Sequence, residues 1–137
     1  MLSKFGIKTL WGGWNNEPYF GFSDEAYKQW KNSIVVGTRI LLYEALKAQE
    51  GYPKGIQAIM AEVEIEKMFD EMVGFTPPTK EHPHLVGVKI LRARGTVAPI
   101  QNAQICKIIN SSRFPSGFSY RKLDEQTYNL LLKEWER

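Results

Sequence analysis

Two short segments combine aromatic rings with amides, hydroxyls and cations, the side chains that suit a flat, polar ligand. The first runs from Trp11 to Phe22 and the second from Phe118 to Lys122. Rings stack on a nucleobase, amides and hydroxyls bond to its polar edge, and Lys or Arg contacts the flanking phosphates. Both segments lie where a loop meets a predicted element, which is where pockets are usually built. The pattern favours base recognition, and the alternative for each ring is a place in the core.

The candidate site residues form two groups. The candidates for the base pocket, as stacking rings, closing rings or polar edge contacts, are Trp11, Trp14, Asn15, Tyr19, Phe22, Tyr43, Ser119 and Tyr120. The candidates for phosphate contacts are Arg92, Arg94, Arg113, Arg121 and Lys122.

The basic residues are unevenly distributed along the chain. Residues 1–70 carry eight Lys or Arg and nine Asp or Glu, whereas residues 86–122 carry seven Lys or Arg and no acid. A basic segment favours a polyanionic partner, because cations held near phosphates release counterions. The alternative is a solvated face whose acidic partners lie elsewhere in the fold, and charge alone leaves both open.

The sequence lacks the common catalytic motifs. It has no G-x-S-x-G elbow, no P-loop and no G-x-G-x-x-G. His82 and His84 lie in a proline-rich loop with no evident third metal ligand, and the single Cys106 excludes a disulfide framework within the chain. We therefore expect no catalytic residue, no cofactor and no metal. Because neither a membrane span nor a signal peptide is evident, we also expect a cytoplasmic protein.

The pattern of apolar residues predicts a mixture of strands and helices. Ser23 is placed to cap a helix over 24–31, and Asp124 to cap a C-terminal helix. A further short helix is expected after Pro99. The predicted strands lie within 5–22, 38–46, 59–65, 85–94 and 118–123. In the strand over 59–65, alternation places Glu62, Glu64 and Glu66 on an exposed face. The order of elements predicts an α+β fold, a small mixed β-barrel with three or so peripheral helices.

Four segments resemble EVE domains of the PUA-like superfamily, which also includes YTH and ASCH domains. They are W-K-N-S-I-V-V-G-T-R-I-L-L-Y-E at 30–44, I-Q-A-I-M-A-E-V at 56–63, the proline-rich stretch 69–88, and S-Y-R-K-L-D-E-Q-T-Y at 119–128. The resemblance extends from Tyr19 to the C-terminus. It implies one EVE or PUA-like domain over 1–137.

The resemblance implies a non-enzymatic nucleic-acid-binding module that holds a modified, flipped base in an aromatic pocket. DNA is expected in preference to RNA, since in some McrBC-type restriction systems such a domain is the N-terminal DNA reader, while stand-alone domains are also common in the family. The implied partners are then a C-terminal motor domain or a separate nuclease subunit. Two alternatives stay open: an ASCH-like hydrolase of acylated nucleosides, and a protein-interaction domain that presents the aromatic N-terminal segment.

Overall fold

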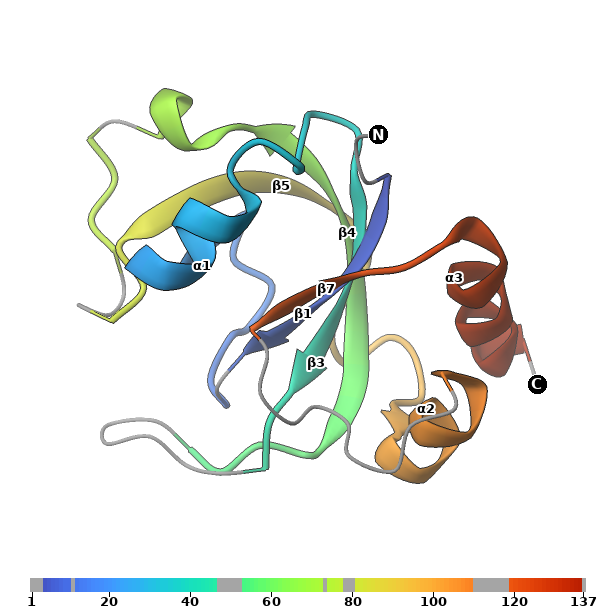
Figure 1. The fold of residues 1–137 in the computed structure, drawn as a ribbon. Helices are drawn as coiled ribbons and strands as arrows, with labels where there is room; N and C mark the ends of the chain where they lie inside the picture. Colours follow the sequence, from blue (N-terminus) through green and yellow to red (C-terminus); the bar gives the residue numbers. More distant parts are fainter. Residues whose placement is uncertain are drawn as a thin grey trace.

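The computed structural model describes residues 4–10, 12–46, 53–72, 74–77, 81–109 and 119–136. A curled mixed sheet forms its centre, with helices on both sides (Figure 1). The strands are β1 (Phe5–Leu10), β2 (Tyr19–Phe22), β3 (Arg39–Glu44), β4 (Ala58–Lys67), β5 (His84–Arg92), β6 (Ile100–Gln101) and β7 (Tyr120–Lys122). The helices are α1 (Asp24–Trp30), α2 (Asn102–Ile109) and α3 (Glu125–Leu132), with 3-10 turns η1 (Phe69–Glu71) and η2 (Lys133–Glu136).

The strand order is β2-β5-β4-β3-β1-β7, and β6 pairs with β4. β1 runs parallel to β3, whereas the other pairs are antiparallel. β2 and β7 are thus the two edges of the curled sheet, and no backbone pairing joins them in the part of the chain that the structure describes. We call this gap between β2 and β7 the barrel seam. The predicted α+β class and small mixed barrel with three helices are confirmed.

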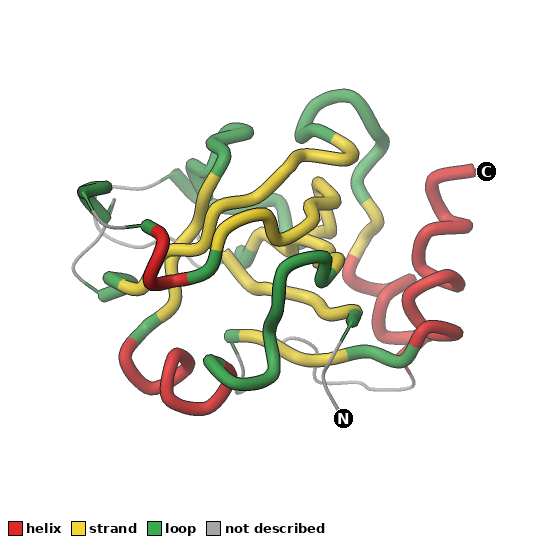
Figure 2. The backbone as a smooth tube through the Cα atoms, turned by 90° about the horizontal axis from the view of Figure 1, so that it is seen from above, coloured by secondary structure: helices red, strands yellow, loops and turns green. Residues whose placement is uncertain are grey.

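The sheet is covered on both faces. α1 lies inside its curve, and α2 and α3 pack on the outer side (Figures 1 and 2). Ile40 and Leu42 of β3 belong to the inner core, whereas Leu41 and Tyr43 belong to the outer core with residues of α2 and α3. Because successive side chains of a strand point to opposite faces, a strand buried on both sides is apolar throughout. This explains the continuous apolar run of β3.

The predicted helix caps are confirmed. The Ser23 side chain accepts a hydrogen bond from the Ala26 backbone amide at 3.2 Å, and Asp124 accepts one from the Thr127 amide at 2.7 Å. These bonds satisfy amides that have no partner within the first turn. The bonds from Thr127 also lower the pKa of Asp124, because they favour the charged carboxylate.

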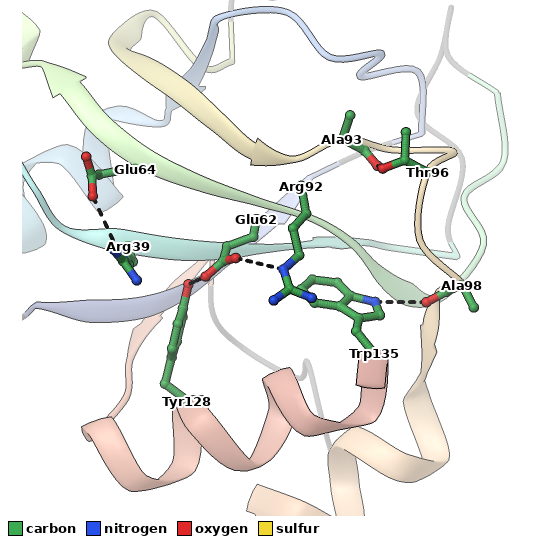
Figure 3. Close-up of polar contacts among 9 residues, drawn as sticks. All are labelled: Arg39, Glu62, Glu64, Arg92, Ala93, Thr96, Ala98, Tyr128 and Trp135. Carbon is green, nitrogen blue, oxygen red and sulfur yellow. Dashed lines mark hydrogen bonds and ion pairs between the residues drawn. The ribbon is translucent and has the colours of Figure 1, made fainter. Parts of the chain in front are cut away.

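The expectation of an exposed glutamate row on β4 is wrong at Glu62. This residue is 4% exposed, because α3 covers it. The Tyr128 hydroxyl donates to Glu62 Oε2 at 2.6 Å, and Arg92 Nε lies 3.3 Å from Glu62 Oε1 (Figure 3). Burial and the bond to Glu62 raise the pKa of Tyr128. Glu64 is half-buried and pairs with Arg39 at 3.4 Å, and of the three glutamates only Glu66 is exposed as expected.

Gly6 on β1 allows the Tyr120 ring to lie directly against the strand. A Cβ atom at position 6 would overlap the ring and hydroxyl of Tyr120, which is 1% exposed and cannot swing aside into solvent. Gly6→Ala should therefore lower the free energy of unfolding by roughly 1–3 kcal/mol, the usual cost of overpacking a core. Urea denaturation measures this loss. In a Tyr120→Leu background the same substitution should cost less, and an equal cost in both backgrounds would contradict the contact.

Candidate functional site

Three aromatic rings bridge the barrel seam. Phe22 ends β2, Trp30 ends α1 and Tyr120 begins β7. The Tyr120 ring lies 6.0 Å from Phe22 and 4.9 Å from Trp30 between centroids, the latter pair edge to face at 73°. Such pairs contribute about 0.5–1.5 kcal/mol beyond burial. Side-chain packing, in place of a backbone ladder, therefore holds these two sheet edges together.

A pocket of about 350 Å³ lies at this seam. Its lining comes from β1, the N-cap and body of α1, the segment before β5, and the start of β7. The lining residues are Thr9, Leu10, Ser23, Glu25, Ala26, Gln29, Trp30, His82, Ser119 and Tyr120. The volume falls at the lower end of the roughly 300–1,000 Å³ that small-molecule sites occupy.

The pocket combines apolar walls with hydrogen-bonding groups. Ala26 and Trp30 are four residues apart on α1, as are Glu25 and Gln29, so the helix presents an apolar and a polar row side by side. Tyr120 and Ser119 lie across the pocket on the β7 side. A flat ligand with one apolar and one polar edge fits this arrangement.

His82 reaches the pocket because Gly21 of β2 lets its backbone approach closely. A Cβ atom at position 21 would overlap the His82 carbonyl oxygen. Burial, and then the charge of Lys8, lower the pKa of His82 below its ordinary 6.5. The imidazole is thus mainly neutral at pH 7 and offers one donor and one acceptor.

Lys8 of β1 lies fully buried behind the pocket wall. Its Nζ atom donates to the Thr9 carbonyl at 3.0 Å and to Ser119 Oγ at 2.9 Å, and it lies 5.0 Å from the centroid of the Phe22 ring. Burial lowers the pKa of Lys8 from 10.5 to about 7, because removal from water disfavours the charged amine. The side chain of Thr9 points the other way, since it shares a face with Ile7 by strand alternation.

Solved structures with a similar fold include two YTH domains. That of the Zygosaccharomyces rouxii MRB1 protein, in complex with N6-methyladenosine RNA, has a TM-score of 0.63 at 8% identity over 99% of this chain and 90% of that one. That of Pho92, in complex with m6A, has a TM-score of 0.61 at 8% identity over 98% and 84%. The chain has a PUA-like fold.

A third structure, Rpa0253 from Rhodopseudomonas palustris solved by NMR, has a TM-score of 0.58 at 13% identity over 97% of this chain and 93% of that one. No family model matches the sequence, and no curated protein matches it significantly. At these identities the PUA-like fold is shown, while the EVE assignment stays a prediction.

The PUA-like barrel brings two of the sequence candidates for the base pocket, Ser119 and Tyr120, to the pocket wall. Phe22 is completely buried behind it. Tyr43 is completely buried on the outer side of the sheet, where its hydroxyl donates to Asn102 Oδ1 at 3.0 Å, so it does not close this pocket.

The other candidates from the N-terminal segment lie away from the pocket. Trp14 is in the core, and its indole donates to the Tyr19 carbonyl at 3.1 Å. The Tyr19 ring lies 6.2 Å from the Phe75 ring between centroids, and neither residue lines this pocket. Asn15 is exposed, and its backbone amide donates to Glu17. Trp11 falls outside the described residues.

Two of the phosphate candidates neutralise buried carboxylates. Arg92 pairs with Glu62 at 3.3 Å and stacks 5.2 Å from the centroid of the Trp135 ring (Figure 3). Arg94 pairs at 3.2 Å with Glu44, whose side chain is 1% exposed. Neither lines the pocket. Arg121 and Lys122 follow Tyr120 on β7, and Arg113 falls outside the described residues.

Sequence reasoning missed Trp30, Gln29 and His82 as pocket residues, and Lys8 as the buried residue behind the pocket wall. Trp30 had a usable signal, since its spacing from Tyr27 marks the inner face of a helix that follows an aromatic strand. Lys8 had a weaker one, a single cation within the apolar strand β1. Nothing in the sequence indicated that 8, 30, 82 and 119 converge.

Neither a membrane-spanning helix nor a metal site is found in the described part of the chain. No helix there is long and apolar enough to cross a membrane. No cluster of three or more His, Cys, Asp or Glu side chains is arranged there to hold a metal ion. His84 instead stacks on Tyr27 at 3.9 Å and pairs with Asp24 at 2.6 Å.

Burial of Lys8 predicts a specific pH dependence of stability. Between pH 7 and 10.5 the unfolded chain keeps the proton that folded Lys8 has released, so this group makes the free energy of unfolding rise with pH across that window. The slope is at most about 1.4 kcal/mol per pH unit. Urea denaturation at several pH values should show this slope in the wild type and its loss in Lys8→Met. Lys122→Met, at an exposed site on β7, should keep the wild-type slope, and an unchanged slope in Lys8→Met would contradict the low pKa.

Proposed function

We propose that this protein binds a nucleic-acid strand by holding one modified base in the pocket at the barrel seam. The observation that carries the proposal is the pairing of two aromatic side chains, Trp30 and Tyr120, with polar groups of Ser119 and Gln29 around one pocket. The two similar YTH structures hold N6-methyladenosine, which supports this class of ligand. The proposal includes no catalytic step.

The pocket suits a base that has left its stack. Flipping costs a few kcal/mol, which stacking and hydrogen bonds inside the pocket offset. Trp30 offers an aromatic wall, while Tyr120 packs against it from β7. Leu10 and Ala26 supply apolar surface for a methyl group, so that a methylated base buries more apolar area than an unmodified one.

The nucleic-acid strand that carries the base has phosphates on either side of it, and these need cations near the mouth of the pocket. Lys122 is exposed on β7 two residues after Tyr120, on the same face of the strand, and it is the phosphate contact we favour. Glu25 on α1 lines the opposite side and disfavours phosphate there. The backbone therefore passes on the β7 side, and binding should weaken as salt concentration rises.

Binding of short oligonucleotides tests the proposal directly. The panel consists of single- and double-stranded DNA and RNA, each with an unmodified base, N6-methyladenine or 5-methylcytosine at one position. We expect salt-dependent binding that is tighter for one modified base. Equal affinity for modified and unmodified probes in both polymers would refute the proposal. The same panel tests the expected preference for DNA, on which the proposed partnership with a motor or nuclease rests.

The decisive variant is Trp30→Ala. Removal of a stacking face should cost about 1–3 kcal/mol for the bound base, and should abolish the preference for the modified probe while residual salt-dependent binding remains. Fluorescence anisotropy at two salt concentrations measures both effects.

The matched control is Trp135→Ala. This indole lies on the outer side of the sheet, where it stacks on Arg92 and donates to the Ala98 carbonyl at 2.8 Å (Figure 3). The control should lose some stability and keep the base preference. Circular dichroism of both variants excludes unfolding as the cause, and a folded Trp30→Ala protein with full base preference would place the pocket elsewhere.

A further inference from the structure

The hydroxyl of Ser119 is constrained from behind by Lys8. A protonated lysine amine has three donor hydrogens and no acceptor, so Ser119 Oγ accepts the 2.9 Å bond from Lys8 Nζ. A second donor bond from the same amine ends on the Thr9 carbonyl at 3.0 Å. The fully buried amine is therefore held in place, and one lone pair of the Ser119 oxygen is occupied.

This arrangement leaves the proton of the Ser119 hydroxyl for another acceptor. A serine hydroxyl has one donor hydrogen and two lone pairs. Within the described ranges no side chain or carbonyl accepts the Ser119 proton, and Ser119 lines the pocket at the seam. The free donor direction is thus available to a ligand in that pocket.

We propose that Lys8 fixes the Ser119 hydroxyl as a hydrogen-bond donor toward the pocket, and that this donor selects bases presenting a ring nitrogen or carbonyl oxygen at that position. The inference rests on the proposed function, which it makes more specific. A base with a C–H group facing the Ser119 hydroxyl makes no hydrogen bond to it, and it leaves that donor unpaired when it binds. Lys8 acts here as a positioning residue and Ser119 as the residue that contacts the ligand.

Aromatic, polar and titratable groups from several elements lie around the amine and the adjoining pocket wall. β2 contributes the Phe22 ring, β7 contributes Tyr120, the residue before β7 is Ser119, the segment before β5 contributes His82, and α1 places Glu25 on the pocket wall. Because burial brings the pKa of Lys8 to about 7, the amine is a pure donor only below that pH. Above it, the neutral amine has a lone pair that competes for the Ser119 proton.

Single-atom changes in the probe test the inference. Short single strands of DNA and RNA carry N6-methyladenine or 5-methylcytosine, and matched strands carry the 1-deaza, 3-deaza or 7-deaza adenine and 3-deazacytosine analogues, which replace one ring nitrogen by C–H. We expect one replacement to weaken wild-type binding at pH 6 by about 5- to 150-fold, the range for a bond whose loss leaves a buried donor unpaired.

Variants then assign that effect to the two residues. Ser119→Ala should bind parent and analogue with equal affinity, whereas Ser119→Thr, which keeps a hydroxyl, should preserve part of the discrimination. Thr96→Ala removes a hydroxyl outside the pocket and should match the wild type. In the wild type the discrimination between parent and analogue should decrease as the pH rises from 6 to 8.5. Lys8→Met should lose that pH dependence. Because this variant keeps His82 and Glu25, the loss would be due to Lys8.

The outcomes separate the two proposals. Failure of every modified probe to bind better than its unmodified counterpart refutes the proposed function, and with it this inference. Modification-dependent binding in which Ser119→Ala discriminates the analogues as the wild type does overturns the inference alone. Loss of discrimination in Ser119→Ala with an unchanged pH profile in Lys8→Met retains the donor and overturns the role of Lys8.

Discussion

The two edge strands β2 and β7 meet through side chains, and the architecture of the site depends on this. A curled sheet whose edge strands are joined by backbone hydrogen bonds has no space for a ligand between them. A seam joined by aromatic rings leaves space wherever the rings do not fill it. Phe22, Trp30 and Tyr120 fill part of the seam, and the pocket is the remainder. Gly6 belongs to the same constraint, because only a residue without Cβ lets Tyr120 lie close to β1.

The two faces of the sheet differ in the kind of contacts they make. On the outer side, buried Glu62 is neutralised by Arg92 and hydrogen-bonded by Tyr128, and Arg39 pairs with Glu64 (Figure 3). On the inner side, α1 lies inside the curve of the sheet (Figure 1), and the pocket lies at the seam beside it. Arg92 therefore has a structural role. It compensates, together with the Tyr128 hydroxyl, for the hydration that the Glu62 carboxylate loses when α3 covers it.

Local rules predicted the elements, while the site required tertiary knowledge. Ser23 and Asp124 cap their helices as expected, because a cap depends only on neighbours in sequence. Aromatic type alone could not separate wall from core: Tyr120 lines the pocket, while Tyr43 lies buried on the opposite face. That difference depends on α2 and α3 covering the outer side, which no spacing within β3 reveals.

The same limit explains the basic stretch. Residues 86–122 contain no acid, yet two of their arginines, Arg92 and Arg94, pair in space with Glu62 and Glu44 from the first half of the chain. Two of the seven basic residues of this stretch are thus neutralised within the fold. On β7, exposed Lys122 stays the proposed phosphate contact, two residues after Tyr120.

Lys8 departs from the rule that buried cations have anionic partners. Its described hydrogen-bond partners are a carbonyl and a hydroxyl, and its desolvation lowers the pKa to about 7. A methionine would fill the same space without that penalty, so the amine makes the fold less stable than it needs to be. Destabilising polar groups of this kind concentrate at functional sites. The position of Lys8 behind Ser119, at the wall of a pocket at the seam, fits that pattern: stability is given up where it orients one hydroxyl.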